Sequence, residues 1–340
     1  MTTGASYTAS PSRYGAMEYR RAGRTGLKLP AISLGLFQNF GADRDYDSAM
    51  EIVGAAFDAG VTHFDLANNY GPPPGSSETI FGELLSRDLR PYRDEIIVSS
   101  KAGFEMWPGP YGNWGSRKYL MASIDQTLRR LKTDYVDVFY SHRVDPDTPL
   151  EETMGALTDI VRQGKALYVG ISSYGCERTR RAADLLGQSG VPLRLHQPSY
   201  SIVNRWIEED GTLDACAELG VGIIAYAVLG HGLLTGKHLA QPARGEQRRT
   251  LPSHHGEART MEAVAKLKAV ADARGQSMSQ MAISWVLRRP EVTSALVGVR
   301  NLAQLQDNLK ALEAAPFTAD ELRQIDAAIA GGAVDRRPQS

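Results

Sequence analysis

Four residues whose side chains can hold or transfer a proton follow three successive β-rich segments of the chain. Asp65 and Tyr70 come after the first segment, whereas Lys101 and His142 end the second and the third. A buried carboxylate is costly unless it is paired, and Lys101 is a candidate partner for Asp65. A charged lysine beside a phenol could in turn hold Tyr70 as a proton donor. These residue types therefore predict a site for acid–base chemistry.

Short β-rich segments alternate with helix-like segments along nearly the whole chain. Strands are expected at residues 31–36, 61–64, 95–101, 136–142, 166–171, 193–196, 222–225 and 293–297. Helices are expected at residues 46–59, 78–85, 117–131, 151–163, 177–186, 211–219, 261–273, 279–287, 302–312 and 319–329. Strands joined by crossover helices form parallel sheets, and eight such units in this length fit a closed barrel. We therefore predict an α/β fold, a (β/α)8 TIM barrel with an N-terminal β-hairpin at residues 19–30, extra helices and a long loop after the seventh strand, at residues 228–260.

In a (β/α)8 barrel the reactive groups come from the carboxyl ends of the strands. These ends carry polar or small residues where a purely structural barrel needs none in particular: Asp65, Lys101, His142, Ser172, Ser173, Gln197, Tyr226 and Gly298. A lone histidine at a strand end is usually structural, and many Asp–Lys pairs are too. The joint placement of all these residues on one rim favours a functional site.

The composition is that of a globular protein with a sizeable core. Of 340 residues, 42% are hydrophobic and 23% are charged. The formal net charge of -1 argues against a nucleic-acid partner and against a polybasic membrane anchor. No apolar run approaches the roughly 20 residues that a membrane helix requires. Two cysteines without a CxxC motif suit a reducing compartment, so we expect a cytoplasmic protein.

We expect a single domain at residues 17–330. The preceding residues 1–16 are rich in Ser, Thr, Gly and Ala and lack the apolar stretch of a signal peptide. We interpret them as a mobile N-terminal tail. Residues 331–340 are interpreted as a C-terminal tail.

Three short motifs resemble nucleotide or metal sites but lack the required context. Residues 220–225 match GxGxxA, yet they lie inside a predicted strand instead of at a strand-to-helix turn. Residues 230–237 resemble a P-loop, but the glycine spacing is wrong and His238 stands where Ser or Thr is needed. His254 and His255 lack a third ligand at recognisable spacing. We therefore expect no metal site.

Several motifs together resemble the aldo-keto reductase superfamily. They lie at residues 64–70 (Phe-Asp-Leu-Ala-Asn-Asn-Tyr), 100–101 (Ser-Lys), 142–149 and 164–173. Residues 71–78, 106–112, 115–119 and 196–202 look most like the bacterial L-glyceraldehyde 3-phosphate reductase branch, which is related to the potassium-channel β-subunits. The resemblance covers nearly the whole chain. It implies the barrel that the patterning predicts and an NADPH-dependent reductase.

The resemblance implies a catalytic tetrad of Asp65, Tyr70, Lys101 and His142. Reducing an aldehyde needs a hydride on carbon, which the nicotinamide supplies, and a proton on the developing alkoxide. A free phenol has a pKa of about 10, so we expect the Lys101 ammonium to lower the pKa of Tyr70. Asp65 would keep Lys101 charged and oriented. His142 would donate a hydrogen bond to the substrate carbonyl.

The same resemblance implies that NADPH/NADP+ binds at the rim. Ser172, Ser173 and Gln197 match the residues that hold the nicotinamide carboxamide. Tyr226 matches the aromatic residue that stacks on the nicotinamide ring. Further cofactor-binding residues are expected at Gly35, Leu36, Leu229, Gly232, Lys237, Gly298, Arg300, Gln304, Asp307 and Asn308.

Two features depart from the family pattern. Ala227 and Val228 stand where relatives usually carry a polar or small residue and a proline, so the backbone there is expected to run differently. The adenosine end has Arg300 but lacks the basic pair of many NADPH-dependent relatives. Arg248 and Arg249 in the long loop could supply that charge, and we favour NADPH over NADH.

A phosphorylated three-carbon aldehyde is our first choice of substrate, with methylglyoxal and other small or aromatic aldehydes as alternatives. Candidates for an aromatic wall over the substrate are Trp107, Tyr111 and Trp114. A planar guanidinium suits a phosphate group. Candidates for that contact are Arg143, Arg117 and Arg205.

Two other functions remain open. A cofactor-sensing subunit, like the potassium-channel β-subunits, would report redox state to a partner. His142 weighs against it because those relatives carry asparagine at this position. A barrel enzyme that forms a Schiff base on Lys101 would leave Tyr70 and Gln197 without a role. A homo-oligomer also remains open, because close relatives often form oligomers.

Overall fold

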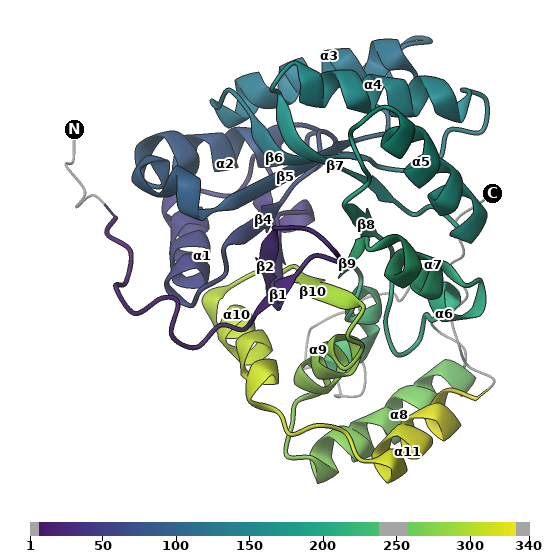
Figure 1. The fold of residues 1–340 in the computed structure, drawn as a ribbon. Helices are drawn as coiled ribbons and strands as arrows, with labels where there is room; N and C mark the ends of the chain where they lie inside the picture. Colours follow the sequence, from purple (N-terminus) through teal and green to yellow (C-terminus); the bar gives the residue numbers. More distant parts are fainter. Residues whose placement is uncertain (1–6, 238–257, 331–340) are drawn as a thin grey trace.

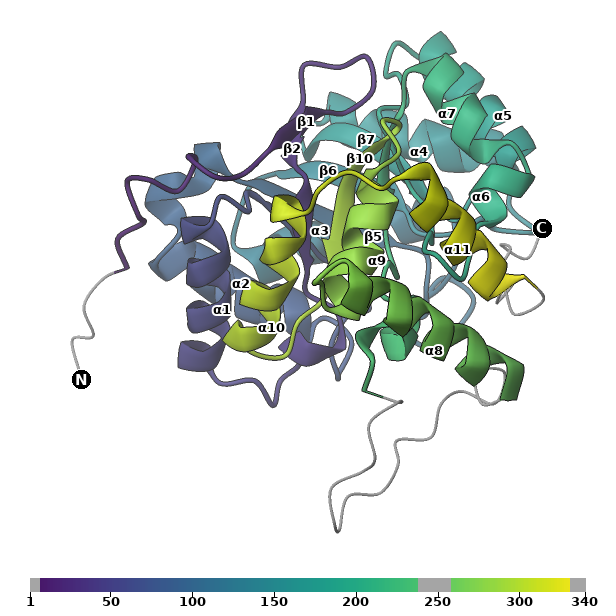
Figure 2. The ribbon, with the colours of Figure 1, turned by 90° about the horizontal axis from the view of Figure 1, so that it is seen from below.

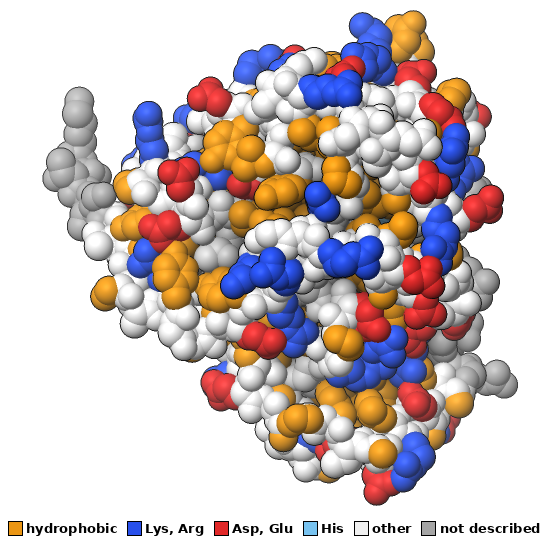
Figure 3. Space-filling model, viewed as in Figure 1, with side chains coloured by type: hydrophobic (Ala, Val, Ile, Leu, Met, Phe, Trp, Pro, Cys, Tyr) orange, Lys and Arg blue, Asp and Glu red, His pale blue; other side chains and the backbone are white. Residues whose placement is uncertain are grey.

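The computed structural model describes residues 7–237 and 258–330. Figures 1 and 2 show the strands at the centre, the helices around them and the short hairpin β1–β2 at one end. On the face that Figure 3 shows, Lys and Arg side chains are interspersed with Asp and Glu. No helix in the described ranges is long and apolar enough to cross a membrane.

Within the described residues, eight parallel strands close into a barrel in the spatial order β10-β3-β4-β5-β6-β7-β8-β9. Their bounds are β3 Ile32–Gly35, β4 His63–Asp65, β5 Ile97–Ala102, β6 Val136–Ser141, β7 Ala166–Ser172, β8 Leu195–Gln197, β9 Gly222–Ala225 and β10 Val292–Val297. The last strand closes the barrel on the first, with Ala295 opposite Ile32. The predicted (β/α)8 barrel is confirmed.

Helices connect the strands and extend the chain beyond the barrel. Their bounds are α1 Tyr46–Asp58, α2 Ser76–Arg87, α3 Arg117–Leu131, α4 Leu150–Arg162, α5 Cys176–Gln188, α6 Trp206–Glu209, α7 Thr212–Leu219, α8 Ala258–Ala273, α9 Met278–Leu287, α10 Leu302–Leu309 and α11 Ala319–Ile329. Short 3-10 helices are η1 Gln38–Phe40, η2 Arg90–Glu95, η3 Gly230–Thr235 and η4 Lys310–Glu313. Several starts carry the expected cap, since Ser277 and Thr318 each form a capping box.

The hairpin, β1 Tyr19–Arg21 and β2 Lys28–Pro30, closes the end of the barrel at which the strands begin. A buried cluster at this end comprises Ala22, Leu27, Leu29, Val138, Tyr140, Leu195 and Ile224. A Cβ added to Gly222, the first residue of β9, would lie 2.8 Å from the Ala22 backbone. The hairpin therefore fills this end, and the carboxyl ends of the strands are left for a site.

Residues 7–16, which the sequence analysis assigns to a mobile tail, instead pack against α1. The Tyr7 hydroxyl and the Ser10 backbone N–H both donate to the Asp58 carboxylate, at 2.8 and 2.6 Å. Polar composition predicts mobility only where a terminal segment finds no partner, and Asp58 provides one here.

The loop predicted at residues 228–260 contains regular structure at both described edges. The 3-10 helix η3 begins two residues after Val228, and α8 begins at Ala258, before the predicted end of the loop. The interior of this loop, the beginning of the predicted N-terminal tail and the whole predicted C-terminal tail lie outside the described residues. These ranges are 1–6, 238–257 and 331–340.

Candidate active site

The four predicted acid–base residues lie together at the carboxyl end of the barrel. Asp65 ends β4, Lys101 lies near the end of β5, His142 follows β6, and Tyr70 lies in the loop after β4. The Lys101 ammonium is 4.9 Å from the centroid of the Tyr70 ring. The ring centroids of Tyr70 and His142 are 5.8 Å apart. The barrel therefore gathers a carboxylate, an ammonium, a phenol and an imidazole in one small volume.

Asp65 and Lys101 form a completely buried ion pair with a 2.5 Å separation. The carboxylate also accepts hydrogen bonds from Ser99 Oγ at 2.6 Å and from Gln197 Nε2 at 3.0 Å. Lys101 Nζ donates a second hydrogen bond to the Leu66 carbonyl at 2.6 Å. Such additional bonds are what make a buried ion pair tolerable. Burial lowers the pKa of Lys101, and the charge of Asp65 opposes that shift.

The structure reverses the expected direction of the Tyr70 pKa shift. Burial raises the pKa of the phenol well above its usual value, and the charge of Asp65 raises it further. Burial outweighs the Lys101 ammonium, which is itself paired with Asp65. Tyr70 is therefore protonated at neutral pH and is able to donate.

His142 contributes a neutral imidazole. Burial lowers its pKa well below the usual value, and the charges of Lys101 and Arg143 lower it further. The Phe104 ring packs edge-on against the imidazole, with 4.7 Å between centroids. His142 Nδ1 is buried without a hydrogen-bond partner among the described residues. A neutral imidazole still carries one N–H, so His142 can donate one hydrogen bond.

The next strand ends bring Ser172, Ser173, Gln197 and Tyr226 to the same rim. The Ser172 hydroxyl donates to the Gln197 backbone carbonyl at 2.8 Å. The Ser173 hydroxyl lies 3.2 Å from the Tyr226 hydroxyl. The Gln197 amide nitrogen is bound to Asp65, but its amide oxygen accepts no hydrogen bond from the described residues. The rim thus offers an acceptor, a hydroxyl and an aromatic ring close together.

The backbone after Tyr226 turns in an unusual way, at Ala227 and Val228, where the sequence departs from the expected pattern. Ala227 has a φ of 54°, which non-glycine residues rarely adopt. Leu229 precedes η3, and Gly232 within it has a φ of 94°. A Cβ added to Gly232 would meet no atom within 4 Å, so the turn borders open space. Lys237 is exposed, and Arg248 and Arg249 lie outside the described residues.

The predicted adenosine-end residues lie in the segment before α10 and along that helix. The Arg300 backbone N–H donates to Gln304 Oε1 at 2.9 Å, and the Arg300 side chain is exposed. The Asp307 carboxylate accepts hydrogen bonds from Ser277 Oγ at 2.9 Å and from Gln280 Nε2 at 2.7 Å. Asp307 therefore anchors the first turn of α9, which weighs against a direct part in cofactor binding.

Gly35 and Leu36 lie at the end of β3, beside the predicted tetrad. The Leu36 backbone N–H donates to the Asp65 carbonyl at 2.9 Å. A Cβ added to Gly298 would lie 3.7 Å from the Gly35 carbonyl, so the ends of β3 and β10 approach closely. Asn308 is buried in α10.

Arg143 is held between two aromatic rings next to His142. Its guanidinium carbon lies 3.5 Å from the centroid of Trp114 and 4.2 Å from that of Phe104. Nε donates to the Gly103 carbonyl at 2.8 Å, and Nη2 donates to Asn113 Oδ1 at 3.0 Å. Nη1 has no hydrogen-bond acceptor in the part of the chain that the structure describes. The guanidinium is therefore oriented with one edge left for an anion.

The other predicted substrate residues have partners elsewhere. The Trp107 ring packs on Tyr119, with 5.1 Å between centroids. Arg117 and Arg205 form ion pairs with carboxylates of α4 and α11, at 2.7 and 2.8 Å. Tyr111 is 53% exposed. Among the arginine candidates, only Arg143 combines proximity to His142 with an edge unpaired within the described residues.

Sequence reasoning missed three residues that shape the site. Phe37 packs edge-on against Tyr70, with 4.7 Å between centroids. Phe104 contacts both His142 and Arg143, and Asn113 holds Arg143. Phe37 is the second residue after the first barrel strand, β3, and this position was the one available signal. Phe104 and Asn113 lie in a long loop whose conformation no local pattern predicts.

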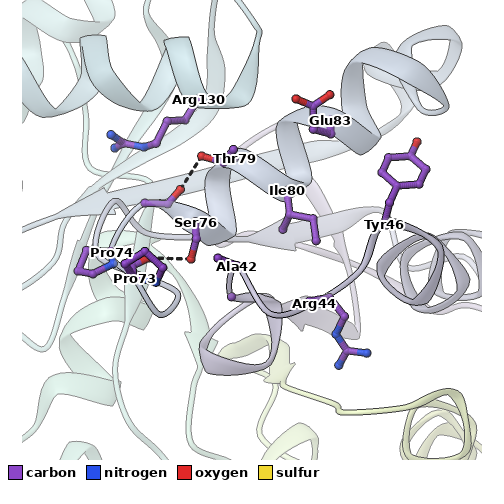
Figure 4. A pocket seen from close by; sticks show the side chains of 12 residues that line it. Ala42, Arg44, Tyr46, Pro73, Pro74, Ser76, Thr79, Ile80, Glu83 and Arg130 are labelled. Atoms are coloured by element: carbon purple, nitrogen blue, oxygen red, sulfur yellow. Dashed lines mark hydrogen bonds between the residues drawn. The ribbon is translucent and has the colours of Figure 1, made fainter.

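A cavity of about 510 Å³ lies beside α2. Figure 4 shows its walls, which come from the loop before α1 and the start of α1, from the loop before α2, from α2 itself and from Arg130 of α3. Pro73, Pro74, Ile80 and Tyr46 make much of the lining apolar. None of the predicted tetrad, cofactor or substrate residues lines this cavity.

Comparison with known proteins agrees with this geometry. A model of the Aldo/keto reductase family matches residues 31–330. L-glyceraldehyde 3-phosphate reductase of Escherichia coli strain K12 is 52% identical over 333 residues, which cover 96% of either chain. A probable voltage-gated potassium channel subunit beta of Arabidopsis thaliana is 33% identical, over 91% of this chain and 96% of the relative. With its closed barrel and this similarity over nearly its whole length, the chain belongs to the aldo/keto reductase family of oxidoreductases.

Proposed function

We propose that this chain reduces small aldehydes to alcohols with NADPH, and that Tyr70 donates the proton. One observation carries the proposal: the Tyr70 ring lies beside the buried Asp65–Lys101 pair, with His142 close to that ring. A carbonyl oxygen that gains negative charge needs a proton and a hydrogen-bond donor. The phenol and the imidazole can supply them. The Lys101 ammonium would stabilise the phenolate that remains.

The residues at the rim fit a nicotinamide group. Its carboxamide carries two N–H donors and one carbonyl acceptor, which complement the Gln197 amide oxygen and the Ser173 hydroxyl. Tyr226 offers a partly buried ring for stacking. When bound, the cofactor supplies the hydride. The rim residues would fix which face of the nicotinamide ring is presented to the substrate, and they would exclude water around the ring.

We propose NADPH as the preferred cofactor over NADH. Arg300 at the start of α10 is exposed and could contact a 2′-phosphate. Arg248 and Arg249, outside the described residues, could add to that charge. We also propose a cytoplasmic location, which suits the free thiols of Cys176 and Cys216.

We propose that the preferred substrate carries a phosphate bound by Arg143. Trp114 and Phe104 hold the guanidinium plane, and Gly103 and Asn113 hold one side of it. A planar guanidinium held in this way can bind phosphate through two parallel hydrogen bonds. The similarity to L-glyceraldehyde 3-phosphate reductase supports a phosphorylated three-carbon aldehyde. Methylglyoxal is the second substrate to test.

The test is the rate of absorbance loss at the nicotinamide band with purified protein. NADPH and NADH are each combined with L-glyceraldehyde 3-phosphate, methylglyoxal and 4-nitrobenzaldehyde. We expect faster oxidation of NADPH than of NADH, with the phosphorylated aldehyde as the best substrate. Tight NADPH binding without turnover of any aldehyde would instead favour a cofactor-sensing subunit, the function that the similarity to a potassium channel subunit suggests.

A further inference from the structure

A continuous chain of hydrogen bonds crosses the barrel interior and ends on Asp65. Ser294 Oγ lies 2.6 Å from Ser33 Oγ, which lies 2.8 Å from His63 Nδ1. His63 Nε2 lies 2.9 Å from Ser99 Oγ, which lies 2.6 Å from Asp65 Oδ1. All five side chains are completely buried. This hydrogen-bond chain therefore has no contact with solvent along its length.

The direction of donation along this chain follows from its two ends. The Asp65 carboxylate can only accept, so Ser99 donates to it and must itself accept from His63 Nε2–H. Burial lowers the pKa of His63 to about 4, with Asp65 raising it and Lys101 lowering it, so the ring is neutral. A neutral ring with Nε2–H accepts at Nδ1, and Ser33 donates there. The tautomer of His63 is thereby determined.

The hydrogen-bond chain ends inside the protein, at Ser294. Besides Ser33, the Ser294 hydroxyl contacts only the Ala31 carbonyl, at 3.4 Å, among the described residues. A route for protons would need an exit to solvent, and these buried groups provide none. The network can therefore orient Asp65, but its Ser294 end gives a proton no route to solvent.

We propose that His63 is a positioning residue for the reduction, because its Nε2–H holds the Ser99 hydroxyl in place to donate to Asp65 Oδ1. Ser99 and Gln197 then occupy Oδ1, and Oδ2 is left to Lys101. His63 thus sets the position of the ammonium next to Tyr70 without touching substrate or cofactor. This inference rests on the proposed function.

Two substitutions at the same position separate the two ring nitrogens. His63→Gln places an amide nitrogen near the position of Nε2 and can still donate to Ser99. His63→Asn places its amide near Nδ1 and cannot reach Ser99. We expect His63→Asn to lower kcat at least about tenfold with KM nearly unchanged, since a small misplacement of a catalytic group has a large effect on rate. His63→Gln should recover most of that loss.

A double substitution shows whether His63 acts through Ser99. Ser99→Ala removes the donor to Asp65, and we expect it to lower kcat at least as much as His63→Asn. The double variant that combines His63→Asn with Ser99→Ala should be no slower than Ser99→Ala alone. Its pH profile of kcat should match that of Ser99→Ala. The proposal would be overturned if the fold-reductions in kcat of the two single variants multiplied in the double variant. It would also be overturned if His63→Gln and His63→Asn lowered kcat equally, since His63 would then have a merely structural role.

A measurement that needs no turnover separates this inference from the proposed function. Nitrogen NMR of the wild-type protein labelled at its histidine rings reports the His63 tautomer directly, with His63→Gln used for assignment. We expect a neutral ring with the proton on Nε2 at pH about 7 and at pH about 5.5. A ring protonated on Nδ1, or charged at neutral pH, would refute the positioning role even in an active enzyme. Absence of turnover together with the expected tautomer would fault the proposed function alone.

Discussion

The ammonium of Lys101 lies 2.5 Å from a carboxylate oxygen of Asp65, and neither side chain is exposed to solvent. Removing one member of such a pair leaves an uncompensated buried charge. We expect Lys101→Met to lower the free energy of unfolding by about 3–5 kcal/mol, measured by urea denaturation. Lys266→Met is the control, because Lys266 pairs with Glu262 on the surface and should change stability by less than about 1 kcal/mol. Equal losses of unfolding free energy in the two variants would contradict the inference that burial makes the Lys101–Asp65 pair sensitive to loss of one partner.

Tyr70→Phe removes only the phenolic oxygen of the proposed proton donor. We expect kcat to fall by about 100-fold to 10,000-fold, because the developing alkoxide loses its acid. Binding of NADPH, followed by quenching of protein fluorescence, should stay nearly unchanged. Tyr111→Phe removes an exposed phenol and serves as the control. Near-normal turnover of Tyr70→Phe would exclude Tyr70 as the proton donor.

Arg143→Lys keeps the charge but loses the planar group between Trp114 and Phe104. We expect KM for the phosphorylated aldehyde to rise about tenfold or more, because an ammonium cannot form two parallel hydrogen bonds to phosphate. KM for 4-nitrobenzaldehyde should change little. Arg117→Lys, at an ion pair on the surface, should leave both constants unaltered. A similar rise for both aldehydes would show that Arg143 supports the site without binding phosphate.

Stability should fall on mild acidification because three buried histidines, His63, His142 and His196, are held neutral. Burial lowers the pKa of His63 to about 4 and that of His196 to about 3. Between the unfolded value of about 6.5 and these folded values, the unfolded chain binds more protons, so the free energy of unfolding decreases as pH falls. Each histidine should contribute about 1.4 kcal/mol per pH unit in this window.

Denaturant unfolding at several pH values between about 7.5 and 5 measures this slope. His196→Asn cannot take up a proton at this position. Below pH about 6.5, the slope of its unfolding free energy against pH should therefore be shallower by the contribution of one histidine, about 1.4 kcal/mol per pH unit. The Tyr174 backbone N–H, which donates to His196 Nε2, loses its partner in this variant, so the slope is compared and not the absolute stability. An unchanged slope would show that His196 is protonated in the folded state.

Two helical glycines should respond to alanine in opposite directions. A Cβ at Gly82 in α2 would lie 2.0 Å from the Arg130 carbonyl of α3, so Gly82→Ala must push two helices apart. We expect a loss of about 1–3 kcal/mol or more. A Cβ at Gly155 in α4 would meet no atom within 4 Å, and Gly155→Ala should stabilise by about 0.5–1 kcal/mol. Thermal unfolding of both variants tests the close approach of α2 and α3.

Several parts of the site could be predicted because they depend on position along a strand. Asp65, Lys101 and His142 each come at or just after the carboxyl end of a β-rich segment, and parallel strands bring those ends to one rim. Phe37 and Phe104, which pack against Tyr70 and His142, come from loops and could not be predicted in this way. Loop conformation depends on distant contacts that leave no periodic pattern in the sequence.

The sequence by itself determined the barrel and the residues at the strand ends, because strand and helix periodicity and strand-end chemistry are local properties. The family followed from the resemblance of several motifs to known proteins. Only the tertiary structure decided the protonation and the partners of these groups. Tyr70 has a raised pKa where sequence reasoning predicts a lowered one, since burial outweighs an ammonium already paired with Asp65. His63 and Ser99 join Asp65 in one network only because neighbouring strands set their register. Electrostatics and hydrogen bonding depend on burial and on distances in space, which the order of residues does not contain.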